Sequence, residues 1–281
     1  MSRAIPRGVA LALAAAVIAT APVASAQQFK PYVGQQGKDV VWVPTPDEVV
    51  ERMLNMAQTK PEDYVIDLGA GDGKIAITAA KKFGARALGI EYNLEMVTHA
   101  QSNARAAGVL GKAQIIHGDI FVTDFTQATV LTMYLLPSLN MKLRPQILAM
   151  RPGTRVVAHA FNMEDWEPDE TSDVDGRRAF LWIVPASVNG RWAMELSGGG
   201  SSEKVSLNLD QKFQRIEGTA YLGPVQAGLR EPRLSGFKIS FAYVDNKSVR
   251  RDFIGRVTGN SMEGSFRTES GQEGRWSATK K

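Results

Sequence analysis

The sequence predicts an α/β domain with a doubly wound, mainly parallel sheet, followed by an all-β module folded as an antiparallel barrel or sandwich. Two patterns support this prediction. Between residues 44 and 161, short apolar runs alternate with segments of helical period, as expected for successive β-α-β units. After residue 178 the helical period is lost, and short segments of alternating apolar and polar residues lie between glycines.

The first domain is expected to begin with a helix and to continue as alternating strands and helices. Pro46 suits the first turn of a helix, and Thr45 before it suits the N-cap position. The strands predicted after this helix cover residues 65–68, 87–90, 114–117, 129–136 and 154–160, and the helices between them cover 75–83, 94–107 and 141–150. Ligands of such sheets bind beyond the carboxyl ends of the strands, near the point where the strand order reverses.

The C-terminal module is expected to consist of short antiparallel strands. Asn189-Gly190 predicts a two-residue hairpin between strands at 180–184 and 191–196, which either completes the first sheet or begins the second. We place the boundary at residue 178, so that the first domain covers 27–178 and the β module 179–281. The aromatic residues of the module are typical of a core, whereas a barrel resembling lipocalin-like modules would hold an apolar molecule or present a surface to a partner.

The first 26 residues have the features of a secretory signal peptide. Two arginines, Arg3 and Arg7, precede an apolar run at 9–21 that ends in Ala24-Ser25-Ala26. The run is shorter than the roughly 20 apolar residues that span a bilayer, so membrane contact is expected to be transient and confined to this segment. We expect export to the periplasm, or a cytoplasmic location if the signal is not used.

Charge and cysteine content exclude several kinds of site. Removal of residues 1–26 takes away two of 33 basic residues and none of 29 acidic ones, and this near-balance gives no electrostatic case for nucleic acid. The absence of cysteine excludes a disulfide framework and thiolate metal sites. The three histidines lack metal-binding spacing, so no metal is expected.

The segment VIDLGAGDGK, residues 65–74, predicts a ligand-binding turn after a strand. It is not a phosphate-binding P-loop, because Ile75 stands where that motif requires serine or threonine. Its three glycines follow the pattern G-x-G-x-G, one residue short of the dinucleotide fingerprint. Asp67, just before them, is a poor neighbour for a pyrophosphate and a good one for a cation.

With Asp67 the pattern becomes D-x-G-x-G-x-G, which resembles the first motif of class I S-adenosylmethionine-dependent methyltransferases. This resemblance implies that Asp67 receives the ammonium group of the cofactor, while the glycines let the backbone lie against it. It further implies that Glu91 binds the ribose hydroxyls and that Asp119 lies near the adenine amino group. The expected cofactor-binding residues are Thr45, Asp67, Gly69, Gly71, Gly73, Glu91, Tyr92, Asp119 and Ile120.

A longer resemblance covers about residues 40–170 and includes VPTPDEVVERML, GDIFVTDF, TMYLLP and MEDWEPD. These stretches resemble bacterial relatives of the mitochondrial protein-lysine methyltransferases that modify the ATP-synthase c-subunit and the adenine-nucleotide translocase. The resemblance implies a protein lysine as methyl acceptor. We also expect a monomer.

The fourth strand is expected to carry the acceptor side of the site. It reads Thr132-Met-Tyr134-Leu-Leu-Pro137 in place of the Asn/Asp-Pro-Pro-Tyr of many adenine and glutamine methyltransferases, which disfavours those acceptors. Tyr134 is expected to shape the reaction centre, with His159 as a proton acceptor. Two alternatives stay open: methylation of a small or lipid-like molecule held by the β module, and a catalytically inactive binding protein of the envelope.

Overall fold

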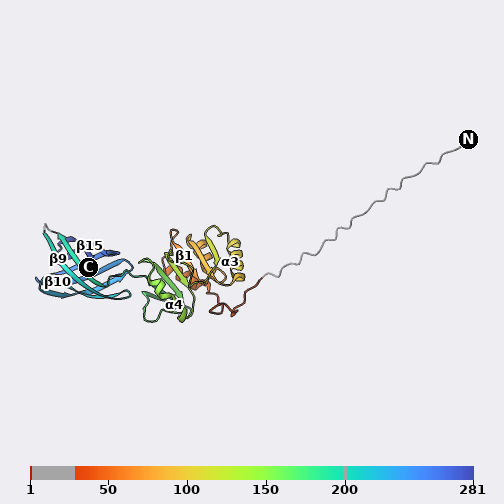
Figure 1. The fold of residues 1–281 in the computed structure, drawn as a ribbon, viewed down its shortest axis with the longest axis horizontal. Coiled ribbons are helices and arrows are strands. Elements are labelled where there is room, and N and C mark those ends of the chain that lie inside the picture. Colours follow the sequence, from red (N-terminus) through yellow and green to blue (C-terminus); the bar gives the residue numbers. More distant parts are fainter. Residues whose placement is uncertain (2–28, 199–200) are drawn as a thin grey trace. The chain divides into compact units, whose positions relative to one another are not determined.

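The computed structural model describes residues 1, 29–198 and 201–281 (Figure 1). The predicted signal peptide therefore lies outside the described residues, except for Met1. The fold given below is that of residues 31–281. No helix in the described part of the chain is long and apolar enough to cross a membrane.

The first sheet has seven strands in the order β3-β2-β1-β4-β5-β7-β6. Its parallel strands are β1 (Tyr64–Leu68), β2 (Arg86–Glu91), β3 (Ala113–His117), β4 (Val130–Met133) and β5 (Arg155–His159). Two antiparallel strands, β7 (Arg177–Ile183) and β6 (Glu170–Val174), complete one edge. The strand order reverses between β1 and β4, which confirms the predicted doubly wound, mainly parallel sheet.

Apolar side chains cover both faces of this sheet, so its strands are nearly continuous apolar runs. Neighbouring residues such as Val65 and Ile66 belong to different buried clusters, one on each face. Helices α1 (Asp47–Met56) and α2 (Lys74–Phe83) contribute to the cluster of Val65, and α4 (Pro137–Leu148) contributes to that of Ile66. Helix α3 (Leu94–Ala106) packs on β3 through Ala100, Ala104 and Ile115.

Two local predictions in this domain were wrong. The N-cap of α1 is Pro46, and no side chain caps the helix, because the hydroxyl of Thr45 contacts the ring of His159 instead. The fourth strand ends at Met133 rather than at 136, and α4 begins at Pro137 rather than at 141. Pro137 supplies the backbone φ angle of a first helical turn and needs no N–H partner there, so the helix begins earlier than predicted.

The predicted hairpin at Asn189-Gly190 is also absent. Strand β7 pairs with β5 in the first sheet, whereas β8, which begins at Gly190, pairs with β9 in the second. The connecting residue Val184 still exchanges backbone hydrogen bonds with Gly153 and Thr154, next to β5. The first sheet therefore continues to Ile183, beyond residue 178.

The second sheet has nine antiparallel strands in the order β11-β10-β9-β8-β16-β15-β14-β13-β12, and it curves into a nearly closed barrel. Its strands are β8 (Gly190–Gly198), β9 (Ser201–Lys212), β10 (Arg215–Leu222), β11 (Val225–Gly228), β12 (Arg230–Ser235), β13 (Lys238–Val244), β14 (Arg250–Thr258), β15 (Ser261–Thr268) and β16 (Glu273–Lys280). This arrangement confirms the predicted all-β module.

Aromatic side chains fill the interior of the barrel. Trp192, Phe241, Phe253 and Trp276 belong to one buried cluster, and the rings of Phe241 and Phe253 stack with centroids 4.9 Å apart. The indole N–H of Trp276 has a hydrogen-bond acceptor within the module, the backbone carbonyl of Ile254. These aromatics form a packed core, as the sequence pattern indicated.

Candidate cofactor and acceptor site

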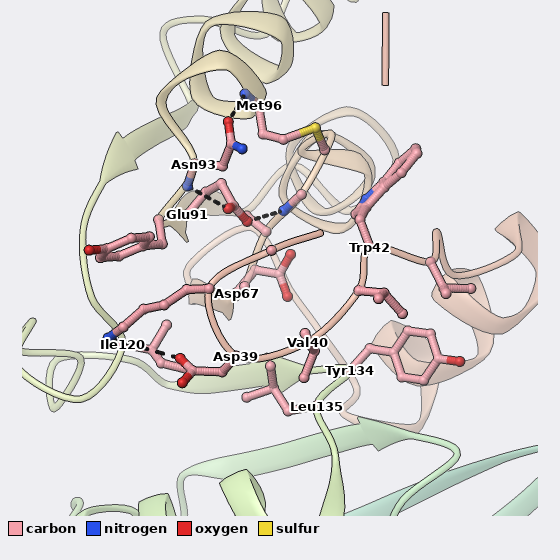
Figure 2. A pocket seen from close by; sticks show the side chains of 18 of the residues that line it. Asp39, Val40, Trp42, Asp67, Glu91, Asn93, Met96, Ile120, Tyr134 and Leu135 are labelled. Carbon is pink, nitrogen blue, oxygen red and sulfur yellow. Dashed lines mark hydrogen bonds and ion pairs between the residues drawn. The ribbon is translucent and has the colours of Figure 1, made fainter. Parts of the chain in front are cut away.

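A cavity of about 350 Å³ lies beyond the carboxyl ends of β1, β2 and β4, where the strand order reverses. Figure 2 shows side chains from several segments gathered around it. Its walls are the turn after β1, the ends of β2 and β4, the residues after β3, and a segment before α1 that includes residues 35–45. The predicted residues that line it are Thr45, Asp67, Gly69, Gly71, Glu91, Tyr92, Asp119, Ile120 and Tyr134.

The glycine turn needs its glycines for two different reasons. All three have positive φ angles, with Gly69 at 77°, Gly71 at 53° and Gly73 at 80°. A Cβ on Gly71 would lie 2.5 Å from Nε1 of Trp42, at the wall of the cavity. Gly73, in contrast, is not among the lining residues; it precedes α2 and packs against Ala100 and Ile115.

Asp67 is a buried carboxylate at the end of β1 and lines the cavity. Its Oδ1 accepts a hydrogen bond from the hydroxyl of Thr132, 2.7 Å away on β4. Burial raises the pKa of Asp67 to about 7, and the nearby carboxylates of Asp72 and Glu91 act in the same direction. No cation in the described part of the chain forms an ion pair with Asp67, so a cationic ligand group would stabilise its charged form.

Glu91 holds the glycine turn against the end of β2. Its Oε2 accepts the backbone N–H of Gly71 at 2.9 Å, and its Oε1 accepts that of Asn93 at 2.8 Å (Figure 2). The side chain of Asn93 in turn caps α3 by accepting from the backbone of Glu95 and Met96. Glu91, the predicted ribose-binding acid, thus also links the glycine turn after β1 to the segment between β2 and α3. Tyr92, beside it, is 47% exposed at the rim.

Asp119 forms an ion pair with Lys38 at 2.5 Å and accepts the backbone N–H of Phe121 at 2.9 Å. The hydrogen bond from Lys38 is the main reason that the pKa of Asp119 lies below its usual value. Lys38 also lies 4.8 Å from the ring centroid of Tyr92. The expected adenine-binding acid is therefore tied to a residue that sequence reasoning did not assign.

Lys38 belongs to a short hairpin of residues 34–42 that covers part of the cavity. Gly34 donates to the carbonyl of Trp42, Trp42 donates to that of Gln35, and Gln36 pairs with Val41. Asp39, Val40 and Trp42 of this hairpin line the same cavity as Asp67 (Figure 2). The sequence did not predict this hairpin, because residues 34–42 are too few to show a regular alternation of apolar and polar residues. The features that could have indicated a turn are Gly34 and Gly37, which lie close to the apolar residues Val40 and Val41.

The rings of Tyr134 and His159 lie against each other where β4 and β5 end. Their ring centroids are 4.0 Å apart, and Phe161 stacks on Tyr134 at 6.1 Å. Nδ1 of His159 lies 3.2 Å from the hydroxyl of Thr45. Burial lowers the pKa of His159 to about 4, with a smaller contribution from Arg177, so this ring is neutral at physiological pH.

The described residues contain no group of three or more histidine, cysteine or acidic side chains placed to hold a metal ion. The groups that the cavity offers to a ligand are its buried carboxylate, its hydrogen-bonded acids and its aromatic end.

Comparison with known proteins places this cavity in a family. Residues 67–170 match the family described as ANTKMT methyltransferase domain. A protein-lysine N-methyltransferase of Saccharolobus islandicus is 46% identical over 151 residues, which cover 52% of this chain and 94% of that relative. A lysine N-methyltransferase of the ATP-synthase c-subunit from Mus musculus is 32% identical over 132 residues, and this chain spans only 53% of its length.

A solved structure supports the same assignment. An RNA methyltransferase from Salinibacter ruber, solved in complex with S-adenosyl-L-homocysteine, matches with a TM-score of 0.51 and 46% identity. The match covers 52% of this chain and 96% of that one. S-adenosylmethionine as cofactor agrees with the buried Asp67 and with the glycine turn, whose Gly69 and Gly71 line the cavity. The chain belongs to the S-adenosylmethionine-dependent methyltransferases, and its residues 67–170 resemble the ANTKMT methyltransferase domain.

Proposed function

We propose that this protein transfers a methyl group from S-adenosylmethionine to a lysine side chain of a protein. The observation that carries this proposal is its 46% identity with a protein-lysine N-methyltransferase, 94% of which it spans. The uncharged aromatic end of the cavity, formed by Tyr134 and Phe161 with the ring of His159 packed against Tyr134, supports it further. Aromatic faces can accept an alkylammonium group and can flank a lysine stem.

The residues of the cavity fit the cofactor group by group. Asp67 would pair with the ammonium group, Glu91 would bind the ribose hydroxyls, and Asp119 and Ile120 would contact the adenine. Thr45, Gly69, Gly71 and Tyr92 would complete the walls. When bound, S-adenosylmethionine supplies an electrophilic methyl group on a sulfonium, whose leaving group is a neutral thioether.

The acceptor must present a neutral amine in line with the methyl group. With S-adenosylmethionine bound, the lysine nitrogen would take its methyl group, and the sulfur would keep the electron pair of the broken bond as a neutral thioether. The extra proton of the methylated nitrogen passes to water. Neutral His159 can accept a hydrogen bond from the amine, while Tyr134 and Phe161 fix its direction.

Orientation is expected to matter more than proton transfer. Correct positioning of two reactants contributes roughly 7–11 kcal/mol, whereas one general base contributes about 10²–10⁴-fold in rate. Tyr134→Ala should therefore lower kcat about 100-fold, while calorimetry shows a Kd for S-adenosylhomocysteine within about threefold of the unmodified protein. Tyr221→Ala, on the barrel, is the matched control and should leave kcat unchanged.

The acceptor itself is identified by labelling. Purified protein is incubated with methyl-labelled S-adenosylmethionine and fractionated cell extract, and the modified residue is located by mass spectrometry. We expect a methylated lysine in one or a few proteins. Label in lipid or small molecules, and in no protein, would contradict the proposal.

RNA is the second candidate acceptor, because the Salinibacter ruber neighbour is described as an RNA methyltransferase. Treatment of the labelled extract with ribonuclease or with protease separates the two acceptors. Loss of label with ribonuclease alone would favour RNA over lysine.

We further propose that residues 1–26 direct export of the protein. Fusion of this segment to a reporter that is active only after export should give an active reporter, because the segment has the basic start, apolar run and A-x-A ending of a signal peptide. Replacing Arg3 and Arg7 by glutamate is the control that should reduce activity. An inactive reporter retained in the cytoplasm would contradict this prediction.

A further inference from the structure

A second cavity of about 390 Å³ adjoins the cofactor cavity. It is lined by Val43, Pro44, Pro46, Tyr134, His159, Ala160, Gly176, Arg177 and Arg178. Val43, Pro44 and Tyr134 line both cavities, so these residues form a common wall. A group placed in the second cavity is therefore next to the residues that face the cofactor.

The inner part of the second cavity is uncharged. Pro44, Pro46 and the ring of Tyr134 are apolar, and His159 is neutral and buried. None of its lining residues is aspartate or glutamate. These walls suit the alkyl stem and the deprotonated amine of a lysine better than they suit a cation, which would find no counter-charge there.

The mouth of the cavity carries two adjacent arginines at the start of β7. Arg177 and Arg178 are both exposed, and neither has an acidic partner within 4 Å among the described residues. Asp173 stands opposite Arg178 in the strand register, but its Oδ1 accepts the backbone N–H of Gly176 at 2.8 Å. Arg178 instead lies 5.7 Å from the ring of Phe180. The two guanidinium groups are thus available to an anion.

We propose that the second cavity is the acceptor site and that Arg177 and Arg178 bind a carboxylate next to the acceptor lysine. The preferred substrate would then be a lysine within an acidic segment of a protein. Guanidinium groups match the geometry of carboxylates, and a carboxylate held at the mouth would guide the lysine inward. This inference rests on the proposed lysine methylation and adds to it the sequence context of the lysine.

The proposal is tested with three peptides that differ only in the residues flanking one lysine: aspartate, asparagine or lysine. The unmodified protein should methylate the aspartate peptide with a kcat/KM about tenfold higher than the asparagine peptide, through a lower KM. In R177Q/R178Q this preference should disappear, and in Arg177→Glu the lysine-flanked peptide should become the better substrate. R275Q, on the barrel, is the control and should keep the original preference.

Two further measurements separate the possible failures. Calorimetry with S-adenosylhomocysteine should give the same Kd for all variants, which shows that the cofactor cavity is intact. Binding of each peptide to the protein loaded with S-adenosylhomocysteine should follow the same order as KM and should weaken at high salt.

Equal methylation of the aspartate and asparagine peptides would overturn this inference and leave the proposed function standing. Labelling of RNA, with none of the peptides methylated, would overturn both, since the arginines would then serve phosphate groups.

Discussion

Replacing Gly71 with arginine is expected to raise the Kd for S-adenosylhomocysteine more than 100-fold. Gly71 has a φ angle of 53°, and its Cβ position is 2.5 Å from Nε1 of Trp42 and 2.9 Å from Cδ1. A side chain there would clash with the indole of Trp42, so that Trp42 or the turn would have to shift at the wall of the cavity. It would also disturb the backbone N–H that Gly71 donates to Glu91.

Gly108→Arg is the matched control for this substitution. Gly108 has a φ angle of 72°, so it places arginine in the same strained region, but no atom lies within 4 Å of its Cβ position. Both variants should lose about 1 kcal/mol of stability to the strained backbone, measured by thermal unfolding. Gly71→Arg should lose more because of its contact with Trp42, and only Gly71→Arg should lose binding in calorimetry. Equal Kd values for the two variants would show that the cofactor does not contact this turn.

Replacing Asp67 with asparagine is expected to weaken cofactor binding strongly and to stabilise the free protein. The loss of a buried charge that pairs with the ligand should raise Kd about 100-fold or more. The gain in stability arises because the charged carboxylate is unfavourable in the folded protein without ligand. Folding raises the pKa of Asp67 from 3.8 to about 7. The free energy of unfolding therefore decreases as pH rises from about 4 to 7.

Asparagine carries no such penalty and can still accept the hydrogen bond from Thr132. At pH 8 the variant should thus be more stable than the unmodified protein by on the order of 1–3 kcal/mol, and by less at pH 5. Denaturant unfolding at both pH values measures this difference, with the exposed Asp210→Asn as control. In the unmodified protein, cofactor affinity should also rise between pH 6 and pH 8 as Asp67 ionises. A variant that binds normally would refute the assignment of Asp67.

The sequence predicted the parts of this protein that local chemistry determines. Strands such as β1 and β5 are apolar on both faces, so the parallel sheet was visible as runs of valine and isoleucine. Strand β6 was not visible, because Glu170–Val174 is a polar edge strand whose formation depends on pairing with β7. Because β6 was not predicted, the strand at 180–184 was paired with the strand after Asn189-Gly190, whereas it pairs with β5 and β6.

The candidate site was predictable where one motif carried the information. Asp67, Gly69 and Gly71 follow from their spacing, and Glu91 from its distance beyond them along the chain. Gly73 fitted the same motif, yet its surroundings are Ala100 and Ile115, a packing relation that only the fold reveals. Lys38 pairs with Asp119, which lies 81 residues further along the chain, and no local sequence pattern predicts such a contact.

The place of Trp42 against the glycine turn has a spectroscopic consequence. The other four tryptophans, Trp166, Trp182, Trp192 and Trp276, are all 2% exposed or less. Trp42 is only partly buried, and its indole lines the cavity. A ligand that enters the cavity changes the polarity around this one indole, so the protein carries an intrinsic fluorophore at the point where cofactor binding occurs.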